Sequence, residues 1–195
     1  MASQSGQLSR RGALRRLGVG AGALAVWPVL SDEGLAAFAR IQEGAASAPV
    51  FLSAAQYAAT EAVAETIIPE DGHSPGARAA RVADYIDLLL SEVEPDVQRA
   101  WVSGLVELDR VARSRGGRPF AELPAEGQLA LLTELSRREA NPTTPLEKFF
   151  KDAKDATIRG YYTSEVGIQR DLKYQGNTFL PEFVGCTHPE HGYEP

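Results

Sequence analysis

The spacing of apolar residues between positions 51 and 162 constrains the fold of this chain most strongly. Apolar side chains recur there at every third or fourth position, as on one face of an α-helix, and no stretch alternates apolar and polar residues long enough for a strand. Proline and glycine divide the pattern into separate segments. The sequence therefore predicts an all-α domain, a compact bundle of about five helices.

The start and end signals place these helices along the chain. Ser53 is a good N-cap and Gln56 completes a capping box, while Pro69 ends the first helix because proline lacks the amide that the next turn requires. A loop follows over residues 69–76. Three further helices are expected at about 82–93, 95–116 and 124–139, and a fifth begins near Pro145. The side chains expected to be buried are Tyr57, Ala64, Ile67, Ile68, Val82, Tyr85, Ile86, Leu89, Val93, Val97, Trp101, Leu105, Leu108, Ala112, Leu129, Leu132, Leu135, Phe149, Phe150, Ala153 and Ala156.

The last part of the chain, residues 163–195, has a different texture. It is rich in glycine, proline and aromatic residues and shows no helical period, so an irregular aromatic-rich C-terminal tail is predicted. Disordered segments are normally poor in aromatic residues, so this tail packs either on its own domain or on another protein. The residues expected to contact a partner are Tyr161, Tyr162, Tyr174, Phe179, Phe183, His188, His191 and Tyr193.

The N-terminus resembles an export signal. Ser9 precedes the pair Arg10 and Arg11, and a weakly apolar, glycine-rich run over 17–26 follows, too short for a comfortable transmembrane helix. This pattern is typical of a twin-arginine signal and predicts a periplasmic protein, although Ala13 stands where such signals often carry a large apolar residue. The alternative is a disordered basic N-terminus.

Two small-x-small motifs could mark the cleavage site of this signal. One is Ala37-Phe38-Ala39, the other is Ala23-Leu24-Ala25, and the run could also stay uncut as a weak anchor. We expect a signal peptide over residues 1–39, a linker rich in alanine, serine and glycine over 40–50, and a helical domain over 51–195.

Charge and cysteine content exclude further classes of protein. The net charge is −6, and a nucleic-acid partner is not expected because phosphate binding needs a basic face. Cys186 is the single cysteine, so an internal disulfide is impossible.

Few residues are candidates for chemistry. Cys186, His188 and His191 are metal-ligand types, but their spacing matches no standard zinc or haem motif, and Pro189 prevents a regular helix there. The competing interpretation is a terminal segment whose polar groups fix its path by hydrogen bonds. His73 is expected to be an exposed loop residue.

Two acidic residues, Asp84 and Asp87, flank Tyr85 on a predicted helix. A solvated acidic face is the expected interpretation, ahead of an acid–base pair. The sequence also lacks the glycine-rich flavin fingerprint after a strand, the C-x-x-C-H haem motif, the G-x-S-x-G motif and the H-E-x-x-H motif. These observations predict no catalytic residue and no cofactor in this chain. Since the twin-arginine route carries folded proteins, a cofactor held by a travelling partner would explain the signal.

Several segments resemble the gluconate 2-dehydrogenase subunit 3 family, over nearly the whole chain from position 51 onward. The most specific are the Ile-Ile-Pro helix end and the Gly-Tyr-Tyr-Thr-Ser stretch. The segments that carry the resemblance are 52–57, 65–69, 74–77, 157–167, 174–176 and 185–191.

The resemblance implies a small subunit of a periplasmic dehydrogenase. In that family the large subunit is an FAD-dependent flavoprotein of the glucose-methanol-choline type that oxidises sugars, gluconate or glycosides, and a cytochrome c subunit with haem c often relays the electrons. The small subunit typically provides the export signal, which implies the twin-arginine translocase as a further partner and a complex either free in the periplasm or held at the membrane. We therefore expect a non-catalytic escort and stabiliser. The alternatives are a stand-alone metalloenzyme built on the cysteine–histidine cluster and an electron-transfer module.

Overall fold

The structure is a computed structural model that describes residues 29–45, 48–174 and 176. These residues form helices and no strand, apart from one isolated bridge between Glu70 and Pro75. The prediction of an all-α fold is confirmed.

The five predicted helices are all present. They are α3 (Ala54–Ile67), α5 (Val82–Glu92), α6 (Pro95–Gly116), α7 (Ala125–Ser136) and α8 (Pro145–Tyr162). The structure adds four elements that the pattern did not predict, namely α2 (Asp32–Gln42), α4 (Gly76–Ala79), the 3-10 helix η1 (Phe120–Glu122) and the π-helix η2 (Val166–Asp171).

Local capping explains where the long helices begin and end. The Ser53 hydroxyl accepts a hydrogen bond from the Gln56 amide at 3.3 Å, and the Gln56 side chain accepts one from the Ser53 amide at 2.9 Å, so the predicted capping box is confirmed. Thr144 and Glu147 form a second box at the start of α8. Helix α6 ends where Gly117 adopts a φ of 70°, which glycine reaches without a steric penalty.

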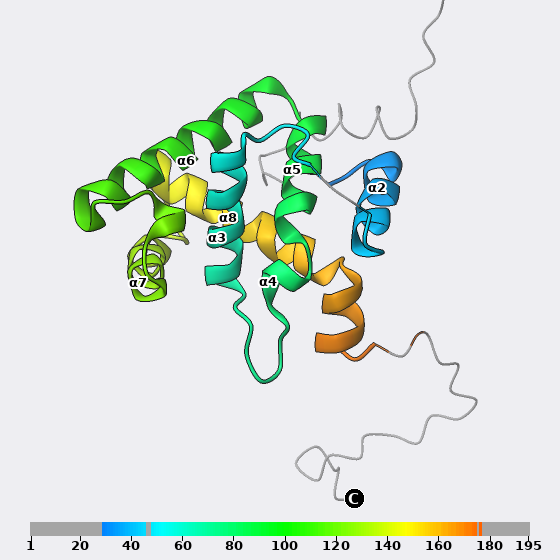
Figure 1. The fold of residues 1–195 in the computed structure, drawn as a ribbon. Coiled ribbons are helices and arrows are strands. Elements are labelled where there is room, and N and C mark those ends of the chain that lie inside the picture. The colour runs from blue at the N-terminus through cyan, green and yellow to red at the C-terminus, as the bar shows by residue number, and fades with distance from the viewer. Residues whose placement is uncertain (1–28, 46–47, 175, 177–195) are drawn as a thin grey trace, which may run out of the picture.

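Helix α8 is the central element of the bundle, with contacts to α3, α5, α6 and α7 (Figure 1). Two glycines allow this close packing. A Cβ on Gly104 of α6 would lie 2.3 Å from the Phe149 ring, and a Cβ on Gly160 of α8 would lie 2.8 Å from the Tyr85 ring. Any larger residue at either position would push a neighbouring helix away from α8.

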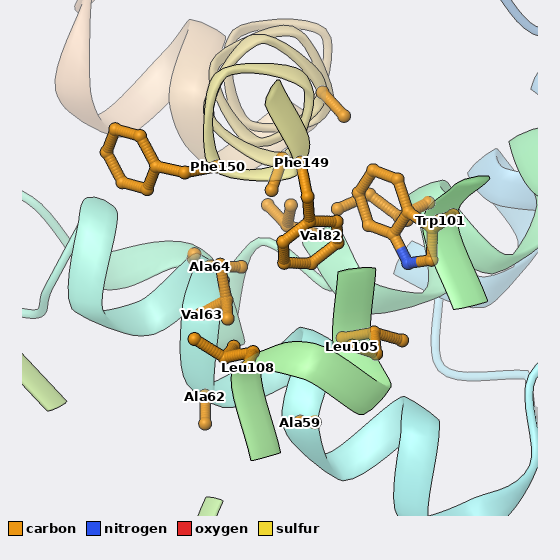
Figure 2. Packing of buried hydrophobic residues seen from close by; sticks show 14 of the residues in the cluster. Ala59, Ala62, Val63, Ala64, Val82, Trp101, Leu105, Leu108, Phe149 and Phe150 are labelled. Carbon is orange, nitrogen blue, oxygen red and sulfur yellow. The ribbon is translucent and has the colours of Figure 1, made fainter. Parts of the chain in front are cut away.

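Side chains from α3, α6 and α8 meet in the core (Figure 2). Trp101 of α6 is buried there and packs edge-on against Phe149 of α8, with ring centroids 5.3 Å apart. Most of the predicted core residues are buried or half-buried. Leu129 is an exception, since 57% of it is exposed: α7 lies at the periphery and buries only the narrow stripe around Leu131 and Leu132.

The start of the predicted tail is more ordered than the pattern indicated. The buried Ser164 hydroxyl donates to the Tyr161 carbonyl at 2.6 Å and accepts from the Gly167 amide at 3.0 Å, which turns the chain back on α8 before η2 begins. A Cβ on Gly167 would lie 2.1 Å from the Tyr161 carbonyl oxygen, so the turn requires glycine. The prediction of an irregular segment is wrong for 166–171, because short-range hydrogen bonds and not apolar periodicity specify this turn.

Helix α2 lies beside α5 at one edge of the molecule (Figure 1). Residues 40–42, which we assigned to the linker, form its last turn, and residues 32–39 of the predicted signal peptide belong to it as well.

Replacement of Trp101 by alanine should lower the free energy of unfolding by roughly 3–5 kcal/mol, because it removes a large buried side chain and leaves a cavity. The control is Leu129→Ala, which should change that free energy by less than about 0.5 kcal/mol. Denaturant titration measures both, and equal losses would show that the buried faces of α6 and α7 are misassigned.

Candidate functional site

A groove of about 540 Å³ lies between residues 96–104 of α6 and 145–152 of α8. The buried residues Trp101, Gly104 and Phe149 form its floor, at the place where Gly104 brings the two helices into contact. Its rim is made of more exposed residues, namely Asp96, Val97, Ala100, Ser103, Pro145 and Lys148. The floor is apolar and aromatic, which suits a side chain from another molecule.

Asp152 gives the groove its main electrostatic feature. The carboxyl group is half-buried, and no residue in the described part of the chain forms a hydrogen bond or an ion pair with it. Burial raises the pKa of Asp152 to about 6, an effect that the charge of Lys151 only partly offsets. Lys151 itself pairs with Asp155 at 2.7 Å.

A desolvated carboxylate without a partner favours the approach of a cation. Lys148 lies one turn earlier on α8 and also lines the groove, but it makes no ion pair with Asp152. The groove therefore combines an apolar floor with an acceptor for a lysine or arginine side chain.

The prediction of a solvated acidic face on α5 is wrong, since Asp84 and Asp87 are both buried. Asp84 accepts a hydrogen bond from the Tyr57 hydroxyl at 2.9 Å and from the Arg81 Nε atom at 2.8 Å. Arg81 adopts a left-handed φ of 58°, unusual for a residue other than glycine, and its contact with Asp84 holds it there. Burial and the neighbouring Asp84 raise the pKa of Tyr57, so the phenol stays protonated at neutral pH and serves as a donor.

Asp87 ties the chain entering α3 to α5. Its carboxylate accepts hydrogen bonds from the amides of Phe51 and Leu52 at 3.1 Å and 2.7 Å, and also from the amide of Val50. One sequence signal could have predicted the burial of Asp84 and Asp87. Most residues of α5 are apolar, so little of the helix surface is left to face water. Both aspartates thus stabilise the fold and form no acid–base pair.

Four large apolar or aromatic side chains are exposed in the last part of α8 and just after η2. We call them together the C-terminal patch, and they are Ile158, Tyr162, Leu172 and Tyr174. Tyr162 is 41% exposed and Tyr174 is 53% exposed, so both are accessible to a partner. Tyr161 is not, because it is fully buried and its hydroxyl lies 2.8 Å from the Ser74 hydroxyl. Its proposed role in partner contact is therefore corrected to core packing.

Of the remaining predicted site residues, the structure describes only His73. His73 is exposed in its loop, as predicted; Asp71 accepts hydrogen bonds from the amides of His73 and Ser74, which lower the pKa of that carboxyl. The remaining candidates lie outside the described residues, namely Arg10, Arg11, Phe179, Phe183, Cys186, His188, His191 and Tyr193.

The described residues contain neither a cluster of metal-ligand side chains nor a helix that could span a membrane. No group of three or more histidine, cysteine, aspartate or glutamate side chains within 29–45, 48–174 and 176 could hold a metal ion. In the same part of the chain, no helix is both long and apolar enough to span a bilayer.

The groove and the C-terminal patch define the class: a small all-α protein with surfaces suited to binding another protein. Comparison with known families supports this view. The family described as gluconate 2-dehydrogenase subunit 3 matches residues 54–181, and the chain belongs to this family, so the predicted resemblance is confirmed. A subunit family of this kind implies a dehydrogenase partner. Neither the curated proteins nor the solved structures provide a match.

Replacement of Asp152 by asparagine should stabilise the isolated chain at neutral pH. The folded-state pKa of about 6 lies above the unfolded value of 3.8, so the protonated carboxyl favours folding at low pH and this contribution is lost as the pH rises through 6. At pH 7 the variant should gain roughly 1 kcal/mol in free energy of unfolding, a figure reduced because the group is partly solvated. At pH 4 the gain should be smaller.

The control is Asp155→Asn on the same helix, where the carboxylate is already paired with Lys151. Denaturant titrations at both pH values should show no gain for this variant. A gain independent of pH at position 152 would contradict the assigned desolvation.

Proposed function

We propose that this chain is the non-catalytic small subunit of an FAD-dependent dehydrogenase of the glucose-methanol-choline type, which it stabilises and escorts to the periplasm. Membership of the gluconate 2-dehydrogenase subunit 3 family is the observation that carries the proposal. The FAD belongs to the large subunit, and haem c to a cytochrome subunit where the complex contains one. The substrate of the complex is a sugar, gluconate or glycoside bound by the large subunit.

The groove between α6 and α8 supports this function as a docking site for the large subunit. Its floor of Trp101 and Phe149 can receive an apolar side chain, and aromatic residues in such pockets contribute strongly to binding. Asp152 would accept a lysine or arginine of the large subunit, whose charge offsets the desolvation of the carboxylate.

The C-terminal patch supports a second contact region. Its exposed apolar and aromatic side chains would lose contact with water if another protein covered them. The segment that follows the patch, 177–195, carries the remaining aromatic candidates predicted from sequence.

Charge reversal in the groove tests the docking site. Asp152→Lys should weaken binding of the purified large subunit at least tenfold, because it replaces an attractive pair by repulsion between two cations. Asp155→Lys, on the same helix outside the groove, should change the Kd less than about threefold. Isothermal titration calorimetry measures both, and equal effects would remove the groove from the interface. Asp152→Asn should also weaken binding although it stabilises the free chain, as expected for a residue kept for function.

Replacement of Arg10 and Arg11 by lysine tests the escort role. Both this protein and the co-expressed large subunit should then remain in the cytoplasm, because the large subunit is expected to carry no export signal of its own. Arg15 and Arg16 form a second adjacent pair, and their replacement by lysine is a matched control that should leave export intact. Cell fractionation followed by immunoblotting with antibodies to both chains measures how much of each chain is in the cytoplasm and in the periplasm. A large subunit that reaches the periplasm without this signal would refute the escort.

A further inference from the structure

Helix α2 packs on the domain although it overlaps the segment expected to be removed with the signal peptide. Phe38 is 2% exposed and Leu30 is 1% exposed. The Phe38 ring meets the Tyr85 ring of α5 edge-on, with centroids 5.4 Å apart and an interplanar angle of 68°. These are core contacts of the kind that α6 and α8 make with each other.

Polar contacts attach both ends of α2 to the domain. At its start, the Ser31 amide and hydroxyl donate to the two carboxylate oxygens of Glu92 at 2.7 Å and 2.6 Å. The same hydroxyl caps α2 by accepting from the Gly34 amide at 3.0 Å. At its end, the Gln42 side chain accepts from the Glu165 amide at 2.7 Å. The helix is thus held at its start, middle and end.

Gly34 shows how closely α2 lies against its neighbours. A Cβ at this position would lie 2.5 Å from a Glu92 carboxylate oxygen and 2.9 Å from the Leu30 side chain. The close approach of Glu92 to the first turn of α2 therefore depends on the absence of a side chain.

This packing decides between the two small-x-small motifs. Ala37-Phe38-Ala39 lies within the last two turns of α2, with Phe38 buried against Tyr85. A peptidase needs an extended segment whose side chains it can reach on both sides of the scissile bond. Ala39 is exposed, but the motif is helical and Phe38 is buried. Cargo of the twin-arginine route folds before it crosses the membrane, so this motif is already part of α2 when a peptidase meets it. Ala23-Leu24-Ala25 lies upstream of every α2 contact described above.

We propose that the signal is cut after Ala25 and that α2 remains as the first helix of the mature protein. The proposal rests on the export signal of the proposed function. Cleavage after Ala39 would remove Leu30, Ser31 and Phe38 from the domain and expose the Tyr85 and Glu92 surface of α5.

The test uses the full chain co-expressed with its large subunit, recovered from the periplasm and analysed by intact mass and N-terminal sequencing. The mature protein should begin at Val26. Ala25→Leu should block processing at least tenfold, whereas Ala39→Leu, at an exposed position of α2, should leave it unchanged. A mature chain that begins at Arg40, or a chain that stays uncut, would overturn the proposal.

A second measurement separates this proposal from failure of export. In the full chain, Phe38→Ala should lower the Tm by about 10 °C, because a buried aromatic side chain is lost. Leu35→Ala, at a position 43% exposed on the same helix, should shift it by less than about 2 °C. If the chain remains cytoplasmic, the escort role is refuted, but these Tm values still show whether α2 packs on the domain. A Phe38→Ala shift as small as that of the control would show that α2 is no part of the domain.

Discussion

The contact of Gly104 with the Phe149 ring is the constraint on which the rest of the bundle depends. It sets how closely α6 approaches α8, and it places Trp101 edge-on against Phe149 in the core. The Trp101 and Phe149 rings that meet at this contact also form the floor of the groove. Stability and the proposed docking surface therefore share one packing arrangement, and a larger residue at 104 would disturb both.

Helix α5 joins segments that are distant in the sequence. Asp84 binds Tyr57 of α3, Asp87 binds the amides of residues 50–52, and Glu92 binds Ser31 at the start of α2. Each carboxylate accepts hydrogen bonds from these donors, and for the buried Asp84 and Asp87 this is the condition under which a buried charge is tolerated, whereas Glu92 is exposed. Asp152 on α8 differs from these three, because no described residue satisfies it. This contrast between Asp152 and the three carboxylates that bind other parts of the fold is the reason for proposing Asp152 as a contact of the large subunit.

The proposed role as an accessory subunit draws on both the family and the surface of the domain. Family membership implies a dehydrogenase partner, and the surface offers an apolar groove with a lone carboxylate and the exposed apolar and aromatic residues of the C-terminal patch. A chain that retains α2 after export would present this surface on a domain braced by Phe38 and by Glu92. The proposed processing concerns α2, which packs on α5, whereas the docking groove lies between α6 and α8, so the two proposals share no residue.

The sequence alone determined the helical class, the five long helices, the capping box at Ser53 and the burial of Trp101. These features depend on residues three or four positions apart, so a local pattern contains them. The tertiary structure decided the burial of Asp84, Asp87 and Tyr161, the exposure of Leu129, the docking of α2 and the groove at Asp152. Those outcomes depend on pairs such as Tyr57 with Asp84, 27 residues apart, and Gln42 with Glu165, 123 residues apart. No periodicity within one segment can specify which distant segment will cover it.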